Sequence, residues 1–186
     1  MILLVNLISF LLLGLLLFLI PGCSSTAGHV KTSNEPNFYY ISGEINANTF
    51  DSIIKILKAN HNKQITFVAN SSGGWITGIN DAMDSIREHG DVNWLVPRGS
   101  ICNSACALLA ISSNRIDGEL GFHSLFATYK GHRYMMYGDN AKLVDKMISY
   151  GYPRELVEKL LNSVNIFYRL SFKEGKLIGE SLSSSP

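Results

Sequence analysis

The hydrophobic positions change their spacing along the chain, and each spacing predicts a different element. Short apolar runs bounded by polar residues or glycine predict strands, and apolar residues three or four apart predict amphipathic helices. We expect strands at residues 38–41, 64–69, 92–96 and 119–122, and helices at residues 49–60, 75–89, 105–111, 140–150 and 153–162. This alternation predicts βα units, in which ligands gather at the carboxyl ends of the strands.

Two segments lack such a pattern. Residues 124–138 are rich in Tyr, Met and Gly without a clear period, and we interpret them as a mobile flap. Residues 167–179 are interpreted as a strand or turn followed by a short helix. The chain contains no internal repeat.

The amino-terminal 22 residues carry no charge and are dominated by leucine, which is typical of an export signal. Cys23 follows directly, and this junction resembles a bacterial lipoprotein box, in which Cys23 would be acylated. A retained transmembrane anchor is the alternative, because the apolar run is just long enough to span a bilayer. Both interpretations predict a membrane-anchored, extracytoplasmic (periplasmic) domain. We expect a tether at residues 23–37, one domain at residues 38–180 and a polar tail at residues 181–186.

The charged residues exclude one class of partner. The 16 basic and 15 acidic residues are mixed without a run of one sign, whereas a nucleic-acid surface needs clustered Lys and Arg. Cys102 and Cys106 invite a disulfide in an oxidising compartment, but cysteines four apart where a turn enters a helix rarely have the required geometry. We therefore expect small buried hydrophobes here, with no metal site and no cofactor.

Three short segments that each follow a predicted strand carry candidate chemistry. Ser104 precedes a wholly apolar segment, so its hydroxyl would lie at the start of a buried helix, beside unpaired N–H groups. Such a serine is either an N-cap or a nucleophile, and the pattern leaves both open. His123 follows the next strand and is a candidate base. Gly73 and Gly74 fit a turn that brings backbone N–H groups close to a substrate carbonyl.

Together these segments resemble the Clp protease proteolytic subunit and its crotonase-fold relatives, particularly exported Clp-like proteins. The matching residues are 68–74, 104–110 and 121–123, with a weaker match from 170 to 179. The resemblance implies a single α/β domain built as a spiral of ββα units. It also implies that Ser104 attacks an acyl carbon, that His123 takes the serine proton, and that the N–H groups of Gly73 or Gly74 and of Ala105 form an oxyanion hole.

The third member of the family's triad is missing from its expected position. The aspartate of the family's proteases aligns with Phe167. Asn165 is the nearest polar candidate to orient His123, because an amide fills this role in papain-like sites. Asp139 and Asp145 are further candidates, although their helix is more simply interpreted as solvated on that face.

Three functions follow from these residues. The first is a membrane-tethered serine hydrolase that acts on a peptide or another acyl substrate. The second is a catalytically degenerate module that binds peptides or proteins, and the third, ranked below both, is coenzyme-A chemistry on the crotonase scaffold. A homo-oligomer is possible, because the helices at residues 140–150 and 153–162 either form an interface or cover the domain's own sheet.

Overall fold

A parallel layer of strands, each followed by a helix, forms the first part of the fold. The computed structural model of the chain describes residues 28–184. In chain order, the layer contains β2 (Phe38–Ser42), α2 (Ala47–Ala59), β3 (Ile65–Asn70), α3 (Ile79–His89), β4 (Val92–Leu95), α4 (Ala105–Ala110) and β5 (Arg115–Phe122). Strands β2 to β5 run parallel to one another.

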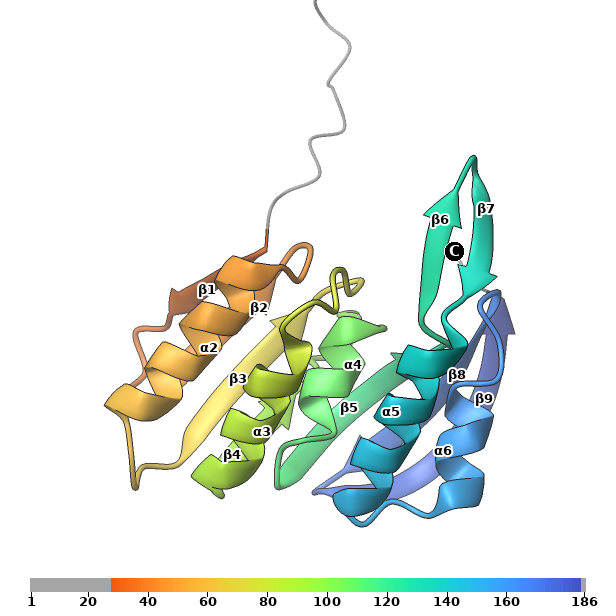
Figure 1. Ribbon diagram of the computed structural model, residues 1–186. Helices are drawn as coiled ribbons and strands as arrows, with labels where there is room; N and C mark the ends of the chain where they lie inside the picture. Colours follow the sequence, from red (N-terminus) through yellow and green to blue (C-terminus); the bar gives the residue numbers. More distant parts are fainter. Residues whose placement is uncertain (1–27, 185–186) are drawn as a thin grey trace, which may run out of the picture.

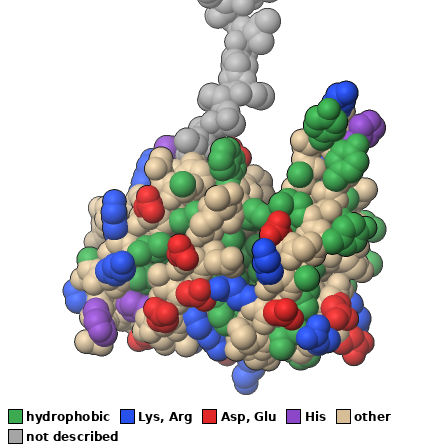
Figure 2. Space-filling model, viewed as in Figure 1, with side chains coloured by type: hydrophobic (Ala, Val, Ile, Leu, Met, Phe, Trp, Pro, Cys, Tyr) green, Lys and Arg blue, Asp and Glu red, His purple; other side chains and the backbone are tan. Residues whose placement is uncertain are grey.

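The second part of the chain adds antiparallel strands and two helices to the far side of β5. It contains β6 (Phe126–Tyr129), β7 (His132–Met135), α5 (Tyr137–Ser149), α6 (Arg154–Leu160), β8 (Ile166–Lys173) and β9 (Lys176–Ser184). The central sheet has the order β1-β2-β3-β4-β5-β8-β9, with β1 (His29–Thr32) and β9 at its edges. Strands β6 and β7 pair only with each other, and their hairpin projects from the surface (Figures 1 and 2).

The core lies between the sheet and the helices that cover one of its faces (Figure 1). Phe67 of β3 packs between Tyr39 and Trp94 of the neighbouring strands, with ring centroids 6.0 Å and 5.4 Å apart. Helix α4 is buried along its whole length, as its uninterrupted apolar sequence predicts.

The parallel strands and the helices between them are confirmed, with shifts at their ends. The largest shifts are four residues: β5 begins at Arg115 rather than at residue 119, and α3 begins at Ile79 rather than at residue 75. Gly78 precedes it with φ 89°, a conformation that ends regular helix geometry. Trp75 therefore lies in the β3–α3 loop, with 64% of its surface exposed, and not on the apolar face of the helix.

The chain folds over a longer range than predicted at both ends. Strand β1 falls inside the predicted tether and pairs antiparallel with β2. Strand β9 replaces the short helix predicted near the carboxyl end and extends into the predicted polar tail. Edge strands face solvent, so β1 and β9 carry no apolar alternation that a pattern analysis can detect.

The predicted flap at residues 124–138 is an ordered β-hairpin followed by the first turn of α5. Lys130 and Gly131 both have positive φ, 49° and 78°, as a two-residue type I′ hairpin turn requires. The sequence lacks the Asn-Gly or Asp-Gly pair that usually signals this turn, and for that reason the hairpin was not predicted.

The apolar faces of α5 and α6 turn inward and pack against their own domain. Leu143 and Met147 of α5 and Val157 and Leu160 of α6 all belong to the buried core. These apolar faces therefore cover the chain's own sheet, and the homo-oligomer stays a prediction.

The predicted signal or anchor and Cys23 lie outside the described residues. Within residues 28–184, no helix is both long enough and apolar enough to cross a bilayer.

Candidate active site

The loop that carries Ser104 continues the sheet where β4 stops. Beyond the end of β4, Cys102 forms a parallel bridge with Ser71 on one side, and Asn103 forms one with Gly121 on the other. The Ser104 N–H then donates to the Gly121 carbonyl oxygen at 2.8 Å. These bonds fix the loop between the carboxyl ends of β3 and β5, where βα folds gather their ligands.

Ser104 has a backbone conformation that few residues other than glycine adopt, with φ 52° and ψ −122°. Its hydroxyl makes no capping hydrogen bond to α4, and the first turn is closed instead by Cys106 N–H donating to the Asn103 carbonyl at 3.0 Å. The N-cap interpretation would require the side-chain oxygen to accept that bond. The geometry therefore leaves the Ser104 hydroxyl available for other chemistry.

Cys102 and Cys106 form a disulfide, which corrects the prediction of two free buried thiols. Their Cα atoms lie 5.2 Å apart, inside the range that a disulfide requires. The sharp turn at Ser104 brings the two residues together, and this turn cannot be inferred from their sequence spacing. The bridge closes a loop around Ser104, and both cysteines are fully buried.

The backbone of the Gly73–Gly74 turn lies directly against Ser104. A Cβ atom at Gly73 would come within 2.6 Å of the Ser104 Cβ and 3.2 Å of the Ala105 nitrogen, so only glycine fits. The Gly73 N–H donates to Ser71 Oγ at 3.1 Å. Among the described residues, the Gly74 N–H donates no hydrogen bond. Ala105 is the first residue of α4, where an N–H has no partner within the helix.

His123 follows β5 directly, and the next residue fixes the orientation of its ring. His123 Nδ1 lies 2.7 Å from the Ser124 carbonyl oxygen, so Nδ1 carries the proton and donates it to this bond. Nε2 is then the unprotonated nitrogen. Ser124 is held in turn by Leu161 and Ser163, whose carbonyl oxygens accept from its Oγ and N–H respectively. Sequence analysis missed Ser124, because the pairing depends on a backbone carbonyl.

The side chains around His123 are mainly apolar. The Phe167 ring packs edge-on against the imidazole at 4.9 Å between centroids, and Phe126 lies at 5.2 Å. Burial of the ring lowers the pKa of His123 below the ordinary 6.5, the Ser124 hydrogen bond raises it, and the charge of Arg133 lowers it further. The imidazole is therefore neutral at pH 7, the form that accepts a proton.

The other candidates for orienting His123 do not contact it through a hydrogen bond. Asn165 is exposed, and its N–H donates to Ser163 Oγ at 3.2 Å, so the role predicted for its amide belongs to the Ser124 carbonyl. Asp139 pairs with Lys142 at 3.6 Å, and Asp145 pairs with Arg154 at 3.8 Å. The position expected for an aspartate does lie beside His123, but it holds the Phe167 ring.

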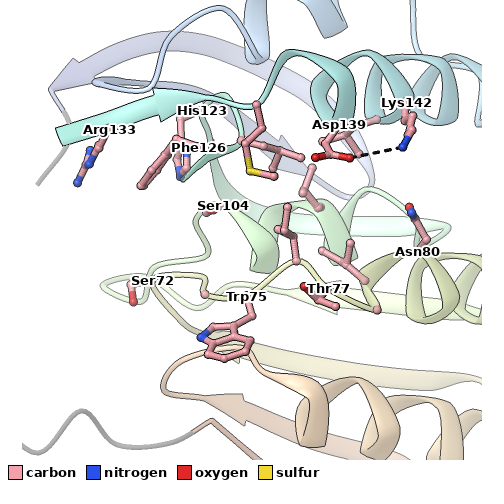
Figure 3. A pocket seen from close by; sticks show the side chains of 18 of the residues that line it. Ser72, Trp75, Thr77, Asn80, Ser104, His123, Phe126, Arg133, Asp139 and Lys142 are labelled. Carbon is pink, nitrogen blue, oxygen red and sulfur yellow. Dashed lines mark ion pairs between the residues drawn. The ribbon is translucent and has the colours of Figure 1, made fainter. Parts of the chain in front are cut away.

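Ser104 and His123 both open into a groove of about 750 Å³ between the β3–α3 loop and the elements from β6 to α5 (Figure 3). Its apolar lining includes Leu108, Leu125, Met136 and Leu143. Arg133 and Phe126 lie at the end near His123, whereas the Asp139–Lys142 pair and Asn80 lie at the other end (Figure 3). Lys142 is a second basic residue of the groove that sequence analysis did not identify.

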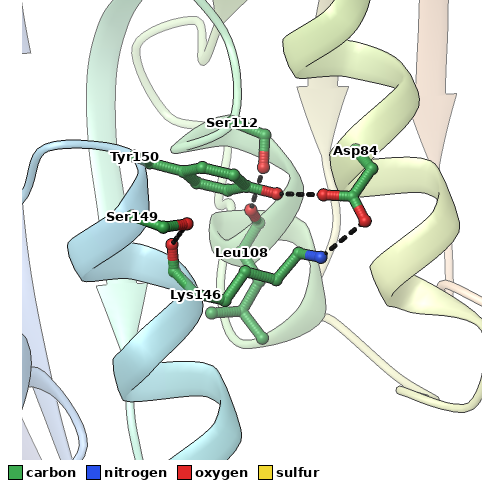
Figure 4. Close-up of polar contacts among 6 residues, drawn as sticks. All are labelled: Asp84, Leu108, Ser112, Lys146, Ser149 and Tyr150. Carbon is green, nitrogen blue, oxygen red and sulfur yellow. Dashed lines mark hydrogen bonds and ion pairs between the residues drawn. The ribbon is translucent and has the colours of Figure 1, made fainter.

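A polar cluster links α3 with the carboxyl-terminal end of α5 (Figure 4). Asp84 of α3 accepts from Lys146 Nζ at 2.6 Å and from the Tyr150 hydroxyl at 2.9 Å. Burial and the Asp84 carboxylate raise the pKa of Tyr150, so the phenol stays a neutral donor. The cluster therefore holds the carboxyl-terminal end of α5 against α3.

The described residues contain no group of three or more His, Cys, Asp or Glu side chains that could hold a metal ion. The chemistry offered by the groove is that of a serine hydroxyl, a neutral imidazole and backbone N–H donors.

No protein-family model matches the sequence, and no curated protein does. Among solved structures, the chain is similar to two variants of the membrane-bound stomatin-specific protease 1510-N. A lysine-to-alanine variant in complex with a substrate peptide matches at 18% identity and TM-score 0.52, over 63% of this chain and 61% of that one. A serine-to-alanine variant matches at 18% identity and TM-score 0.49, over 63% and 65%. The chain thus spans less than two thirds of the length of both.

The likeness to the peptide complex confirms the predicted single α/β domain, with a central mixed sheet and helices. At 18% identity it concerns the fold alone.

Proposed function

We propose that the protein is a membrane-tethered, extracytoplasmic Clp-like serine hydrolase that cleaves peptides or another acyl substrate. The observation that carries the proposal is the backbone of Ser104. A non-glycine residue at φ 52° costs on the order of 1–3 kcal/mol, and such strain is typical of functional sites. In this chain the strained backbone places a Ser104 hydroxyl that makes no helix-capping hydrogen bond in the groove that also contains His123.

In this mechanism Ser104 Oγ attacks the carbonyl carbon of the substrate while His123 Nε2 accepts the hydroxyl proton. The Ser124 carbonyl holds the Nδ1–H and keeps Nε2 free for that transfer. The Gly74 and Ala105 N–H groups donate to the oxyanion, and one such donor contributes on the order of 2.7–4 kcal/mol. His123 then protonates the leaving group, and water releases the acyl group from Ser104 by the same proton transfers in reverse.

His123 is a better base than Lys142, which also lines the groove. Lysine acts as a base only when burial or a neighbouring cation favours its neutral form. The Lys142 side chain is 79% exposed and paired with Asp139, so it has neither the burial nor the neighbouring cation that such a base requires. His123, in contrast, lies among aromatic rings that favour the neutral imidazole.

Two features support the proposed location. The uncharged amino-terminal segment and Cys23 fit an exported, lipid-anchored chain, with a retained anchor as the alternative. The Cys102–Cys106 disulfide fits an oxidising compartment, because disulfides are rare in the cytosol.

The alternative is a Clp-like module that binds peptides or proteins without cleaving them. Phe167 motivates it, because a carboxylate that would stabilise the imidazolium is replaced by an apolar ring. The Ser124 carbonyl orients His123 but carries no full charge.

A peptide library incubated with the full chain in detergent micelles separates the two functions. We expect new peptide ends, read by mass spectrometry, that are absent with Ser104→Ala and persist with Lys142→Met. Library peptides that are retained intact by both the wild-type chain and Ser104→Ala would instead establish the binding module.

A further inference from the structure

The two faces of the β6–β7 hairpin differ in their surroundings: one lines the groove, and the other faces away from it. The register places Phe126 opposite Met135 and Thr128 opposite Arg133, and this face includes Phe126 and Arg133 of the groove wall. Because side chains alternate across a strand, the remaining positions form the other face. We call this the outer face: Ala127, Tyr129, His132 and Tyr134.

The outer face is aromatic, and the turn beside it carries a cation, Lys130. Tyr129 and Tyr134 are 63% and 54% exposed, and Lys130 at the turn lies 5.3 Å from the centre of the Tyr129 ring. Residues 124–138 contain Lys130, His132 and Arg133 and no Asp or Glu. In a chain with a formal net charge of only +1, this hairpin is a local concentration of positive charge at the end of a projection (Figure 2).

The hairpin projects on the side of the domain where the described chain begins. A Cβ atom at Gly28 would collide with the carbonyl of Glu44, which follows the carboxyl end of β2. Figure 1 shows the start of β1 and the hairpin turn directed to the same side. Only five residues separate Cys23 from Gly28 (28 − 23 = 5), and five residues span at most about 18 Å.

We propose that the outer face of the hairpin docks on an anionic lipid surface, next to the point where the chain is anchored. Tyrosine is enriched at the interface between lipid and water, where its ring is apolar and its hydroxyl is hydrated. Lysine and arginine near that surface are attracted to anionic headgroups over about one Debye length. This part of the argument rests on the proposed anchoring at Cys23, which would place the bilayer on the side from which the hairpin projects.

A second copy of this chain fits the outer face less well. A two-fold interface would place the same patch on both sides, so Lys130 of each copy would face an outer face and a turn that contain no carboxylate. A lipid surface supplies the missing negative charge. Docking would also place the mouth of the groove beside the bilayer, because the hairpin forms part of the groove wall.

Hydrogen–deuterium exchange on the full chain in lipid nanodiscs tests this proposal. One chain is inserted per disc of phosphatidylcholine alone or of phosphatidylcholine with phosphatidylglycerol. The uncharged amino-terminal segment would associate equally with either bilayer, so the comparison isolates the headgroup charge. We expect the amides of residues 126–135 to exchange at least about fivefold more slowly in the anionic discs, since each docked cation contributes about a fivefold effect.

Two variants of equal charge make the result specific. Lys130→Gln should remove most of the slowing, whereas Lys58→Gln, an exposed cation in the last turn of α2, should leave it unchanged. Equal exchange in the two kinds of disc would overturn the proposal. Slowing that is absent with one chain per disc, but appears in either lipid once two chains share a disc, would assign the face to a second copy. Neither outcome depends on hydrolysis, so the proposed catalytic function is unaffected by it.

Discussion

Ser104 adopts a backbone conformation that its immediate neighbours stabilise. The bridges of Cys102 and Asn103 hold the residues before it, the Gly121 carbonyl accepts its N–H, and the disulfide links the two sides of the turn. The closed loop is short, and in the chain-entropy view even a short crosslink stabilises the fold by about 2 kcal/mol. That is enough to offset the conformational strain of one serine, on the order of 1–3 kcal/mol.

The environment of His123 predicts the pH dependence of the reaction at Ser104. Burial and Arg133 lower the pKa of His123, and proton transfer needs the neutral ring. The neutral fraction falls as pH falls through that pKa, so the rate of Ser104 modification should be half-maximal below pH 6.5.

Arg133→Gln removes one of the charges that lower the pKa of His123. The pH of half-maximal rate should therefore rise. The measurement is the rate of fluorophosphonate labelling between acidic and neutral pH, with Lys58→Gln as a charge-matched control that should not shift it. A half-maximum above pH 6.5 in the wild type, or a downward shift in Arg133→Gln, would contradict this account of the imidazole.

At the scale of elements, the polar cluster between α3 and α5 is the clearest target for a stability measurement. Asp84→Ala leaves the Lys146 ammonium, only 18% exposed, without its carboxylate and leaves the Tyr150 hydroxyl without an acceptor. We expect the free energy of unfolding to fall by roughly 2 kcal/mol, since hydrogen bonds to charged groups contribute that much. Chemical denaturation monitored by circular dichroism measures the change.

Asp145→Ala is the matched control for this prediction. It makes the same change within a helix, but the Asp145–Arg154 pair is exposed, with 75% and 60% of the two side chains accessible. Exposed pairs contribute little, so the loss should stay below about 0.5 kcal/mol. Equal losses in the two variants would mean that Asp84 does not anchor α5.

Which elements could be predicted depended on burial. Strands β2 to β5 and the helices between them have apolar runs or helical periods, because each faces the core, and they were predicted. The β6–β7 hairpin and β9 are mostly exposed, so their strand structure comes from pairing and from turns at Lys130–Gly131 and Glu174–Gly175 with positive φ. Such turns depend on backbone conformation that these residue types do not disclose.

For the molecule as a whole, three short motifs in a fixed order were sufficient to predict the fold. They also contain the main candidates, which the structure places in one groove. Ser104, His123 and the Gly73–Gly74 turn are distant in sequence, but they meet because the parallel strands before them end at the same edge of the sheet. The disulfide and the Ser124 carbonyl were not predicted, because both depend on the path of the backbone rather than on residue type.

The whole molecule combines a candidate hydrolytic groove with a surface that fits a membrane. The hairpin contributes Phe126 and Arg133 to the groove and presents Tyr129 and Tyr134 to the outside. If both proposals hold, the substrate would be an acyl or peptide bond close to the bilayer. The peptide-library and nanodisc measurements test these two properties separately.

The most direct test of the central claim is covalent labelling of Ser104 in the full chain by a fluorophosphonate, located by mass spectrometry of the digested protein. Labelling requires an activated serine, so we expect modification at Ser104 in the wild type and in Lys142→Met, and its loss in His123→Ala. Circular dichroism would verify that each variant is folded. An unlabelled Ser104 in the folded wild-type chain, or labelling that persists unchanged in His123→Ala, would contradict the assignment of a Ser104–His123 nucleophile and base.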